Sequence, residues 1–178
     1  MDAITLLEND HKTVNQLFGR FQRSSKPETL SSLAREIVHE LSVHAAVEEQ
    51  FVYPMIRLRA EQGGELADHS IDEHATVKRL LADLEKLDAT QAGFERKMGQ
   101  VIDAVRHHVK EEESEILPTL RRSVKRDQLQ RLGSIIEQAK AVVPTHPHPL
   151  VPGTATAQLI AGPWASVLDH LRDLLTAA

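Results

Sequence analysis

The sequence predicts an all-α protein, an antiparallel four-helix bundle of two helix hairpins with extra helices at its C-terminal end. Apolar residues recur at three- and four-residue steps through four long segments, which is the pattern of a helix with one buried face. No segment shows the two-residue alternation of a strand. The connections between the four segments are short, which favours antiparallel neighbours.

The four bundle helices are expected at about residues 3–22, 28–61, 67–88 and 92–118. The first helix ends before Pro27, and the second helix begins near this proline. Pro54 interrupts the apolar pattern of the second helix and predicts a kink or local unwinding, because proline lacks the N–H that a helix needs. Gly63 and Gly64 are expected to break the chain before the third helix, and Pro118 is expected near the end of the fourth.

The C-terminal third of the chain changes in character. A fifth helix is predicted at residues 125–143, and residues 144–163 contain five of the eight prolines, which predicts an irregular connector. A short amphipathic helix is expected at about 164–176. The chain is therefore divided into a bundle, residues 1–122, and a C-terminal part, residues 123–178, that packs on the bundle.

Composition limits the functions that the chain can have. A length of 178 residues suits one domain with appendages. The net charge is -5 with Lys and Arg interleaved among acids, which argues against a nucleic-acid partner, since that needs a basic stripe. The chain has no cysteine, so disulfides, thiolate-bound zinc and a catalytic thiol are excluded. Any metal must be bound by nitrogen and oxygen.

The N-terminal segment MDAITLLENDH has acids where a secretory signal has positive charge. No apolar run approaches the roughly 18 residues of a membrane-spanning helix. We therefore expect a cytoplasmic protein without a membrane partner, present as a monomer or a weak dimer.

One motif occurs twice in the chain. His-x-x-x-Glu-Glu, with Pro ten residues after the His, occurs at His44–Pro54 and again at His108–Pro118. An acid–His pair precedes each copy by 33 or 34 residues, as Asp10-His11 and Glu73-His74. The sequence thus contains two copies of one helix hairpin, each with a His on its first helix and His-x-x-x-Glu on its second.

The spacing of this motif predicts a metal site. Residues four apart lie on one face of a helix, so His44 with Glu48, and His108 with Glu112, can each bind one ion. A single His or Glu on a helix is usually a surface or core residue, and the metal prediction rests on their joint occurrence at duplicated positions. Buried carboxylates are costly unless paired, and two metals bridged by the carboxylates would satisfy the whole set. The predicted ligands are His11, His44, Glu48, His74, His108 and Glu112.

These motifs resemble those of the hemerythrin HHE cation-binding family. The resemblance covers about residues 1–120 and includes Glu49 and Glu113 beside the two motif glutamates, and Tyr53 before Pro54. It implies a four-helix up-down bundle that holds two non-haem irons, with carboxylate and oxo or hydroxo bridges. It also implies chemistry with oxygen, peroxide or nitric oxide, in the response to oxidative or nitrosative stress.

Two positions depart from the oxygen-carrying members of that family. Those proteins have a fifth His one turn before the residue that matches His74, and here that position is Ser70. His69 lies about 140° away from that face, so it is a poor substitute. The acid after His108 is Glu112, four residues on, instead of an Asp five residues on. The chain is therefore more similar to the hemerythrin-like subset than to the oxygen carriers.

Tyr53 is the only tyrosine. It is a candidate additional ligand, or a hydroxyl group beside the ligands, and the alternative is an aromatic core residue. The remaining histidines are expected to lie away from the metals, although His107 could exchange roles with its neighbour His108. Besides His69, they are His39, His107, His146, His148 and His170.

Three functions remain open at this point. The first is a di-iron protein that reacts with or senses a small oxidant or gas, as a catalase-like enzyme, a nitric-oxide-reactive enzyme, a sensor or a reversible oxygen binder. The second is an iron-handling or storage protein without turnover, and the third is a bundle with structural zinc. Imidazole and carboxylate ligands shared by two ions favour iron, since structural zinc prefers four ligands in a closed tetrahedron. No catalytic residue is assigned.

Overall fold

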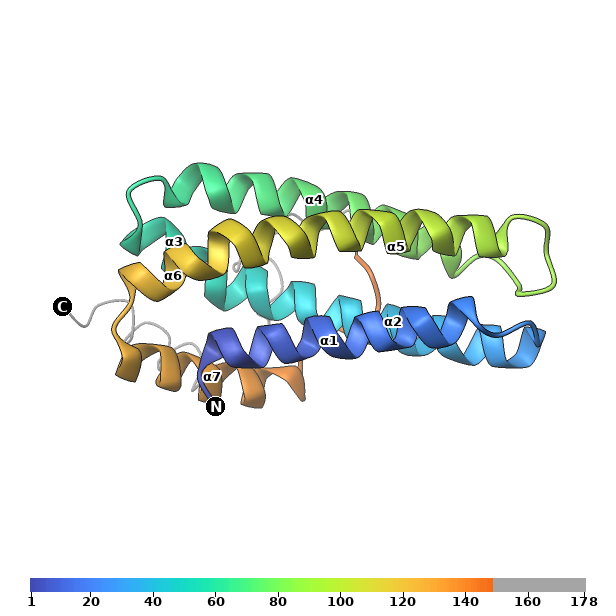
Figure 1. The fold of residues 1–178 in the computed structure, drawn as a ribbon, viewed down its shortest axis with the longest axis horizontal. Coiled ribbons are helices and arrows are strands. Elements are labelled where there is room, and N and C mark those ends of the chain that lie inside the picture. The colour runs from blue at the N-terminus through green and yellow to red at the C-terminus, as the bar shows by residue number, and fades with distance from the viewer. Residues whose placement is uncertain (149–178) are drawn as a thin grey trace.

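Four long helices lie side by side, and successive helices run in opposite directions (Figure 1). The structure, a computed structural model, describes residues 1–148, and within that range the regular elements are all helical. The long helices are α1 (Ala3–Gln22), α2 (Pro27–Val47), α4 (Gly63–Leu84) and α5 (Phe94–Glu111). The predicted all-α bundle is confirmed. None of the described helices is long and apolar enough to cross a membrane.

Two of these helices continue past a proline through a widened turn. The π-helical turn η1 (Glu48–Val52) joins α2 to α3 (Tyr53–Arg59). In it the Tyr53 N–H donates to the Glu48 carbonyl, five residues back. The wider turn accommodates Pro54, which has no N–H to donate, without ending the helix. The local unwinding predicted at Pro54 is confirmed.

The second copy of the motif repeats this feature. The π-helical turn η2 (Glu112–Ile116) joins α5 to α6 (Leu117–Ser123), and the Leu117 N–H donates to the Glu112 carbonyl. The prediction that the fourth helix ends near Pro118 is wrong, because the widened turn lets the chain stay helical to Ser123.

Gly63 begins α4, which corrects the expectation that the two glycines break the chain before the third helix. A Cβ at Gly63 would lie 2.0 Å from the Ile56 carbonyl oxygen. Only glycine lets the backbone of α4 approach α3 this closely. The third helix therefore starts four residues before its predicted position.

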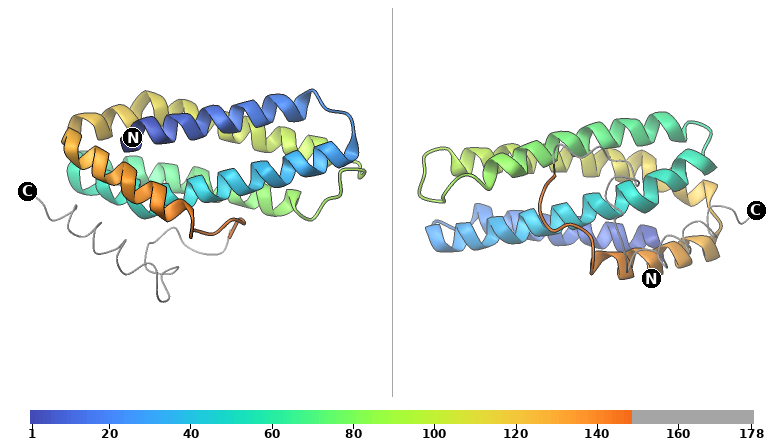
Figure 2. Two further views of the ribbon diagram at one scale, coloured as in Figure 1. Left: turned by 90° about the horizontal axis from the view of Figure 1, so that it is seen from below. Right: turned by 180° about the vertical axis from the view of Figure 1, so that it is seen from behind.

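The fifth predicted helix is present as α7 (Arg126–Lys140). It packs along the outer side of α1 and α2 and buries Leu132 and Ile136 completely (Figure 2). The short helix predicted at residues 164–176, most of the predicted connector and His170 lie outside the described residues.

Two separate apolar clusters form the core. One joins α7 to the first turns of α1 and includes Leu7, Ile56 and Leu132. The other fills the opposite part of the bundle and includes Phe18 and Met98. Along α1 and α4 the predicted His ligand lies between residues of the two clusters, and along α2 and α5 it lies near the boundary between them. The fold thus holds a polar layer between two apolar ones.

Replacing Gly63 with Ala should lower the free energy of unfolding by about 1–3 kcal/mol, because the new methyl group must displace the backbone of α3. The adjacent Gly64 provides the control, since nothing lies within 4 Å of a Cβ there. Gly64→Ala should be neutral or stabilising by up to about 1 kcal/mol. Equal urea-denaturation midpoints for the two variants would contradict this close contact.

Candidate metal centre

The six predicted ligands meet in the polar layer of the bundle. Each is at most 6% exposed, and both glutamates are completely buried. Every long helix contributes one His, and the two π-helical turns contribute the glutamates. The contributions are His11 from α1, His44 from α2, Glu48 from η1, His74 from α4, His108 from α5 and Glu112 from η2.

Two of the histidines form a pair on one side of the carboxylates. The His11 Nε2 and His44 Nε2 atoms are 3.2 Å apart. His11 Nε2 lies 3.1 Å from Glu112 Oε2, and His44 Nε2 lies 3.1 Å from Glu48 Oε1. These four side chains place their ligand atoms within reach of one ion.

The other two histidines form an equivalent pair. His74 Nε2 and His108 Nε2 are 3.1 Å apart. His74 Nε2 lies 3.3 Å from Glu48 Oε2, and His108 Nε2 lies 3.7 Å from Glu112 Oε2. Each glutamate therefore faces one His of each pair, which is the arrangement that two ions bridged by two carboxylates require.

The opposite ring nitrogen of every His contacts a second carboxylate. The Nδ1–carboxylate distances are 2.9 Å for His11–Glu113, 3.2 Å for His44–Asp10, 2.9 Å for His74–Glu49 and 2.8 Å for His108–Glu73. A carboxylate at Nδ1 holds the proton there and fixes the ring orientation, so that the Nε2 lone pair is free for a metal.

These four outer carboxylates were not predicted to have a role. A signal was present, because each is adjacent in sequence to a predicted ligand. Asp10 precedes His11 and contacts His44, on the next helix of the same hairpin. In the same way, Glu73 precedes His74 and contacts His108. Glu49 and Glu113 follow the motif glutamates, and each holds a His of the other hairpin. The sequence alone could not assign these partners, because they depend on how the hairpins pack.

Lysines neutralise two of the outer carboxylates. Lys140 Nζ lies 2.5 and 2.6 Å from the two Asp10 oxygens, and Lys78 Nζ lies 2.7 and 2.6 Å from those of Glu49. Burial alone would raise the pKa of Asp10, but His44 and Lys140 hold it below its usual value. Both carboxylates thus remain charged and able to orient a His.

The donor set fits metal ions better than it fits the protein alone. All four carboxylate oxygens of Glu48 and Glu112 are buried, and none makes a hydrogen bond of acceptable geometry with the described residues. Burial alone would lower the pKa of His74, but the adjacent carboxylates of Glu48 and Glu49 outweigh it and raise the pKa to about 9. The centre therefore attracts positive charge, which protons or metal ions can supply.

Tyr53 is fully buried at the edge of this centre. Its hydroxyl oxygen lies 3.1 Å from His74 Nε2. Burial and the charges of Glu48 and Glu112 raise the pKa of the phenol well above its ordinary value. Ser70, which stands at the position of the fifth His in oxygen carriers, is also buried, and its hydroxyl donates to the Leu66 carbonyl.

The described histidines outside the set of six do not reach the centre. His39 and His148 are exposed, and His146 pairs with Glu85 on the surface. His69 and His107 also lie on the surface, and both contact Glu111. His107 does not exchange roles with His108.

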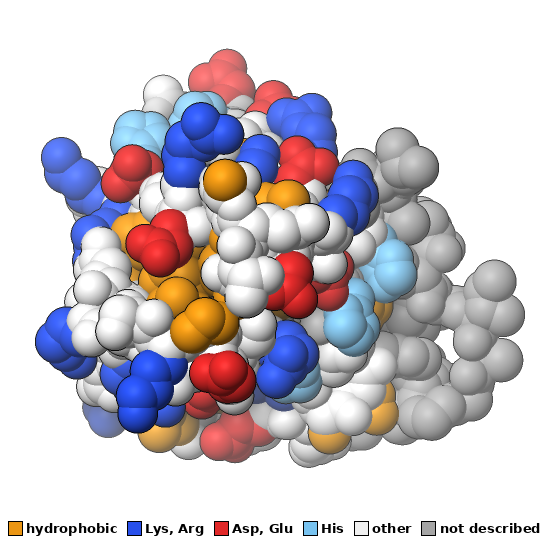
Figure 3. Space-filling view, turned by 90° about the vertical axis from the view of Figure 1, so that its right-hand side faces the viewer, with side chains coloured by type: hydrophobic (Ala, Val, Ile, Leu, Met, Phe, Trp, Pro, Cys, Tyr) orange, Lys and Arg blue, Asp and Glu red, His pale blue; other side chains and the backbone are white. Residues whose placement is uncertain are grey.

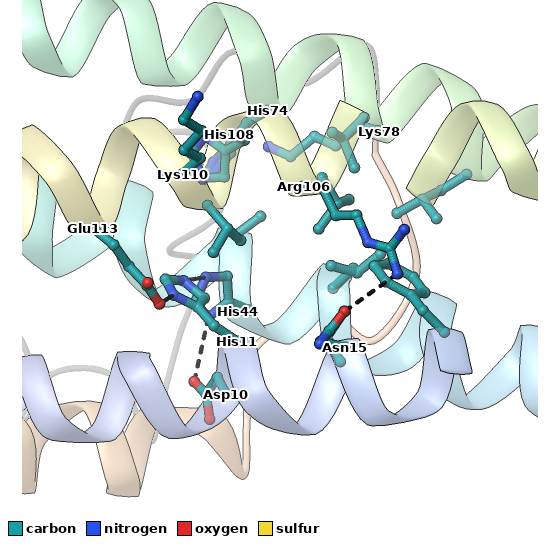
Figure 4. Close-up of a pocket in the computed structure, with 18 residues that line it drawn as sticks. Asp10, His11, Asn15, His44, His74, Lys78, Arg106, His108, Lys110 and Glu113 are labelled. Atoms are coloured by element: carbon teal, nitrogen blue, oxygen red, sulfur yellow. Dashed lines mark hydrogen bonds and ion pairs between the residues drawn. The ribbon is translucent and has the colours of Figure 1, made fainter. Parts of the chain in front are cut away.

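A cavity of about 280 Å³ connects the centre with the surface. Figure 4 shows that the four ligand histidines lie along it. Aliphatic side chains such as Val77 and Val105 form most of its wall, and the exposed residues Arg106 and Lys110 also line it. The cavity has room for a small molecule beside the four imidazoles.

Comparisons with known proteins agree with this fold and site. The family model described as "Hemerythrin HHE cation binding domain" matches residues 2–120. The fold and the clustered His and Glu side chains are those of a helical cation-binding domain. The chain belongs to the hemerythrin HHE family.

Individual relatives support the same assignment. The chain is 28% identical over 167 residues to an uncharacterized hemerythrin-like protein from Schizosaccharomyces pombe, covering 93% of this chain and 82% of that protein. A crystal structure of a hemerythrin HHE cation-binding domain-containing protein from Mycobacterium kansasii has a TM-score of 0.69 at 21% identity, covering 79% of this chain and 88% of that one. At this identity the likeness shows the fold.

A third relative is larger. The chain is 28% identical over 143 residues to a DNA nickase from Nostoc sp., covering 80% of this chain but 40% of the nickase. The chain thus spans less than half the length of that protein.

Glu113 provides a direct test of the outer carboxylates. Replacing Glu113 with Ala should weaken metal binding by about 10–100-fold, because His11 loses the group that orients it. Glu95, an exposed glutamate at the other end of α5, is the control. Competition with a chelator measures both affinities, and equal affinities would show that Glu113 has no part in the centre.

Proposed function

We propose that this chain binds two iron ions and reacts with a small oxidant or gas, namely peroxide, oxygen or nitric oxide. One observation carries the proposal: two buried carboxylates without hydrogen-bond partners lie between two pairs of inward-facing imidazoles. His11 and His44 would hold one ion, His74 and His108 the other, and both glutamates would bridge them.

The ligand chemistry favours iron over structural zinc. A structural zinc ion uses four ligands in a closed tetrahedron, whereas here six side chains serve two ions and leave positions open. Iron bound there would supply electrons to an oxidant, which zinc cannot do. The four ligand histidines line a cavity with mostly apolar walls, which would admit small neutral molecules and limit bulk water.

Tyr53 would complete the ligands of the ion held by His74 and His108. Its oxygen lies 3.1 Å from His74 Nε2, and two ligands of one ion at about 2.1 Å are separated by about 3 Å. In the metal-free protein the charges of Glu48 and Glu112 keep the phenol protonated. An adjacent cation acts in the opposite direction and favours the phenolate.

Nucleic acid is not part of this proposal. Figure 3 shows one end of the bundle, where cationic and anionic side chains are interspersed. Nucleic-acid binding depends on a basic stripe, and this face has none. The activity of the Nostoc nickase is not transferred to this chain. We propose that the chain acts as a monomer or a weak dimer.

Reaction with oxidants tests the proposal against iron storage and reversible oxygen binding. Iron-loaded protein is reduced without air and then mixed with peroxide, oxygen or nitric oxide, while its optical spectrum and the products are recorded. The proposal expects a di-ferric resting protein that consumes peroxide and forms at most a short-lived oxygen adduct. A store would give up its iron to a chelator without consuming peroxide, and an oxygen carrier would release oxygen unchanged under vacuum.

Glu112→Gln should lower the iron content well below two ions per chain, because the amide removes a bridging charge. In the metal-free state the same variant should melt no lower than the wild type, since it removes a buried carboxylate that lacks a hydrogen-bond partner. Iron should therefore raise the melting temperature of the wild type more than that of the variant. Two irons in Glu112→Gln would rule out the bridging role.

Tyr53→Phe should abolish a visible phenolate-to-iron absorption band of the ferric protein. The chain has one tyrosine, so this band has a single source. Because Phe keeps the aromatic ring, the variant should fold as the wild type does, and its iron content should stay above one ion per chain. Identical visible spectra of the two proteins would show that Tyr53 only fills space beside His74.

A further inference from the structure

A second group of metal-binding side chains lies on the surface, between α4 and α5. His69 and Glu73 are four residues apart on α4, and His107 and Glu111 are four residues apart on α5. Each pair therefore projects from one face of its helix. The two helices pack against each other, so the two pairs meet across their interface.

The distances between His and carboxylate atoms in this group are close to those between neighbouring ligands of one ion, and His107 contacts both carboxylates at the edge of the group. His69 Nε2 lies 2.8 Å from Glu111 Oε2, and His107 Nε2 lies 3.3 Å from Glu111 Oε1 and 3.6 Å from Glu73 Oε1. Ligands about 2.0–2.1 Å from a tetrahedral ion are separated by about 3.3 Å. The ligand atoms of His69, Glu73 and Glu111 all lie within 4.8 Å of one another.

We propose that His69, Glu73, His107 and Glu111 form a surface site for one divalent transition-metal ion, separate from the centre inside the bundle. Two imidazoles and two carboxylates suit Fe²⁺ or Zn²⁺, whereas Ca²⁺ and Mg²⁺ prefer oxygen ligands alone. The His side chains are more than 60% exposed, so an ion can reach the site from solvent.

In the first half of the chain, α7 covers the surface that corresponds to this site, and other residues occupy the corresponding positions. By the offsets of the repeat, Leu6, Val43 and Val47 correspond to His69, His107 and Glu111, and all three are buried in the apolar cluster that includes α7. Asp10 corresponds to Glu73, and Lys140 of α7 neutralises it. Among residues 1–148, α7 has no counterpart in the second half, and a bound metal ion would neutralise Glu73 as Lys140 neutralises Asp10.

Glu73 connects the surface site with the inner centre. Its Oε2 atom contacts Nδ1 of the inner ligand His108 at 2.8 Å, while its Oε1 atom faces His107. A hollow of about 570 Å³ beside His69 and His107 is lined by the carboxylates of Glu65, Glu111 and Glu115, and Lys110 is the one lysine or arginine among the described residues that line it. This negative charge attracts cations. We therefore assign the surface site as the point where iron enters, a role that rests on the proposed function of the inner centre.

Zinc titration of the iron-loaded, full-length protein tests the site. The wild type should bind one additional zinc ion per chain in equilibrium dialysis. The variant His69→Ala/His107→Ala should lose this ion or bind it more than about tenfold more weakly, since even outer-shell changes cost at least that much. His39→Ala, which removes an exposed His of α2, should bind zinc as the wild type does. Equal zinc binding by wild type and double variant, or none by either, would overturn the site.

Iron uptake by metal-free protein tests the entry role. The double variant should fill with Fe²⁺ severalfold more slowly than the wild type and the His39→Ala control, and it should reach the same final iron content. Equal uptake rates would overturn the entry role. The zinc measurement stays informative if the inner centre binds no iron, because the difference of one zinc ion between wild type and double variant does not depend on the inner ligands.

Discussion

The structure depends on two carboxylates buried at the middle of a helix bundle. Glu48 and Glu112 are fully buried and lack hydrogen-bond partners among the described residues, so the bundle is stable only if positive charge lies beside them. Four imidazoles supply the positions for that charge, and each is oriented by a further carboxylate. The two apolar clusters on either side hold the helices in register around this layer.

Contacts between charged side chains connect the centre with the surface of the bundle. Lys140 of α7 binds Asp10, which in turn orients His44, so the docking of α7 outside the bundle also stabilises an inner ligand. On the opposite half of the bundle Glu73 orients His108 as Asp10 orients His44, and no helix within residues 1–148 covers that surface. Within the described residues, the same internal repeat thus gives a face covered by α7 in one half and an exposed face in the other.

The duplicated motif was sufficient to predict the helical bundle and the meeting of six side chains, because helix periodicity fixes which residues share a face. It did not predict the outer carboxylates, whose partners depend on packing between hairpins. The extension of the fourth helix past Pro118 was also missed, since a π-helical turn leaves no clear signal in apolar periodicity. Gly63 was read as a chain break, whereas its role is the close approach of α3 and α4.

The central claim is that one pair of irons sits between the two halves of the repeat. X-ray absorption spectroscopy of the iron-loaded protein measures this directly. The account predicts an iron neighbour within about 4 Å of each iron, as in other two-metal centres, with imidazole nitrogen and carboxylate oxygen in the first shell. A spectrum that shows isolated iron without a second metal neighbour would contradict it.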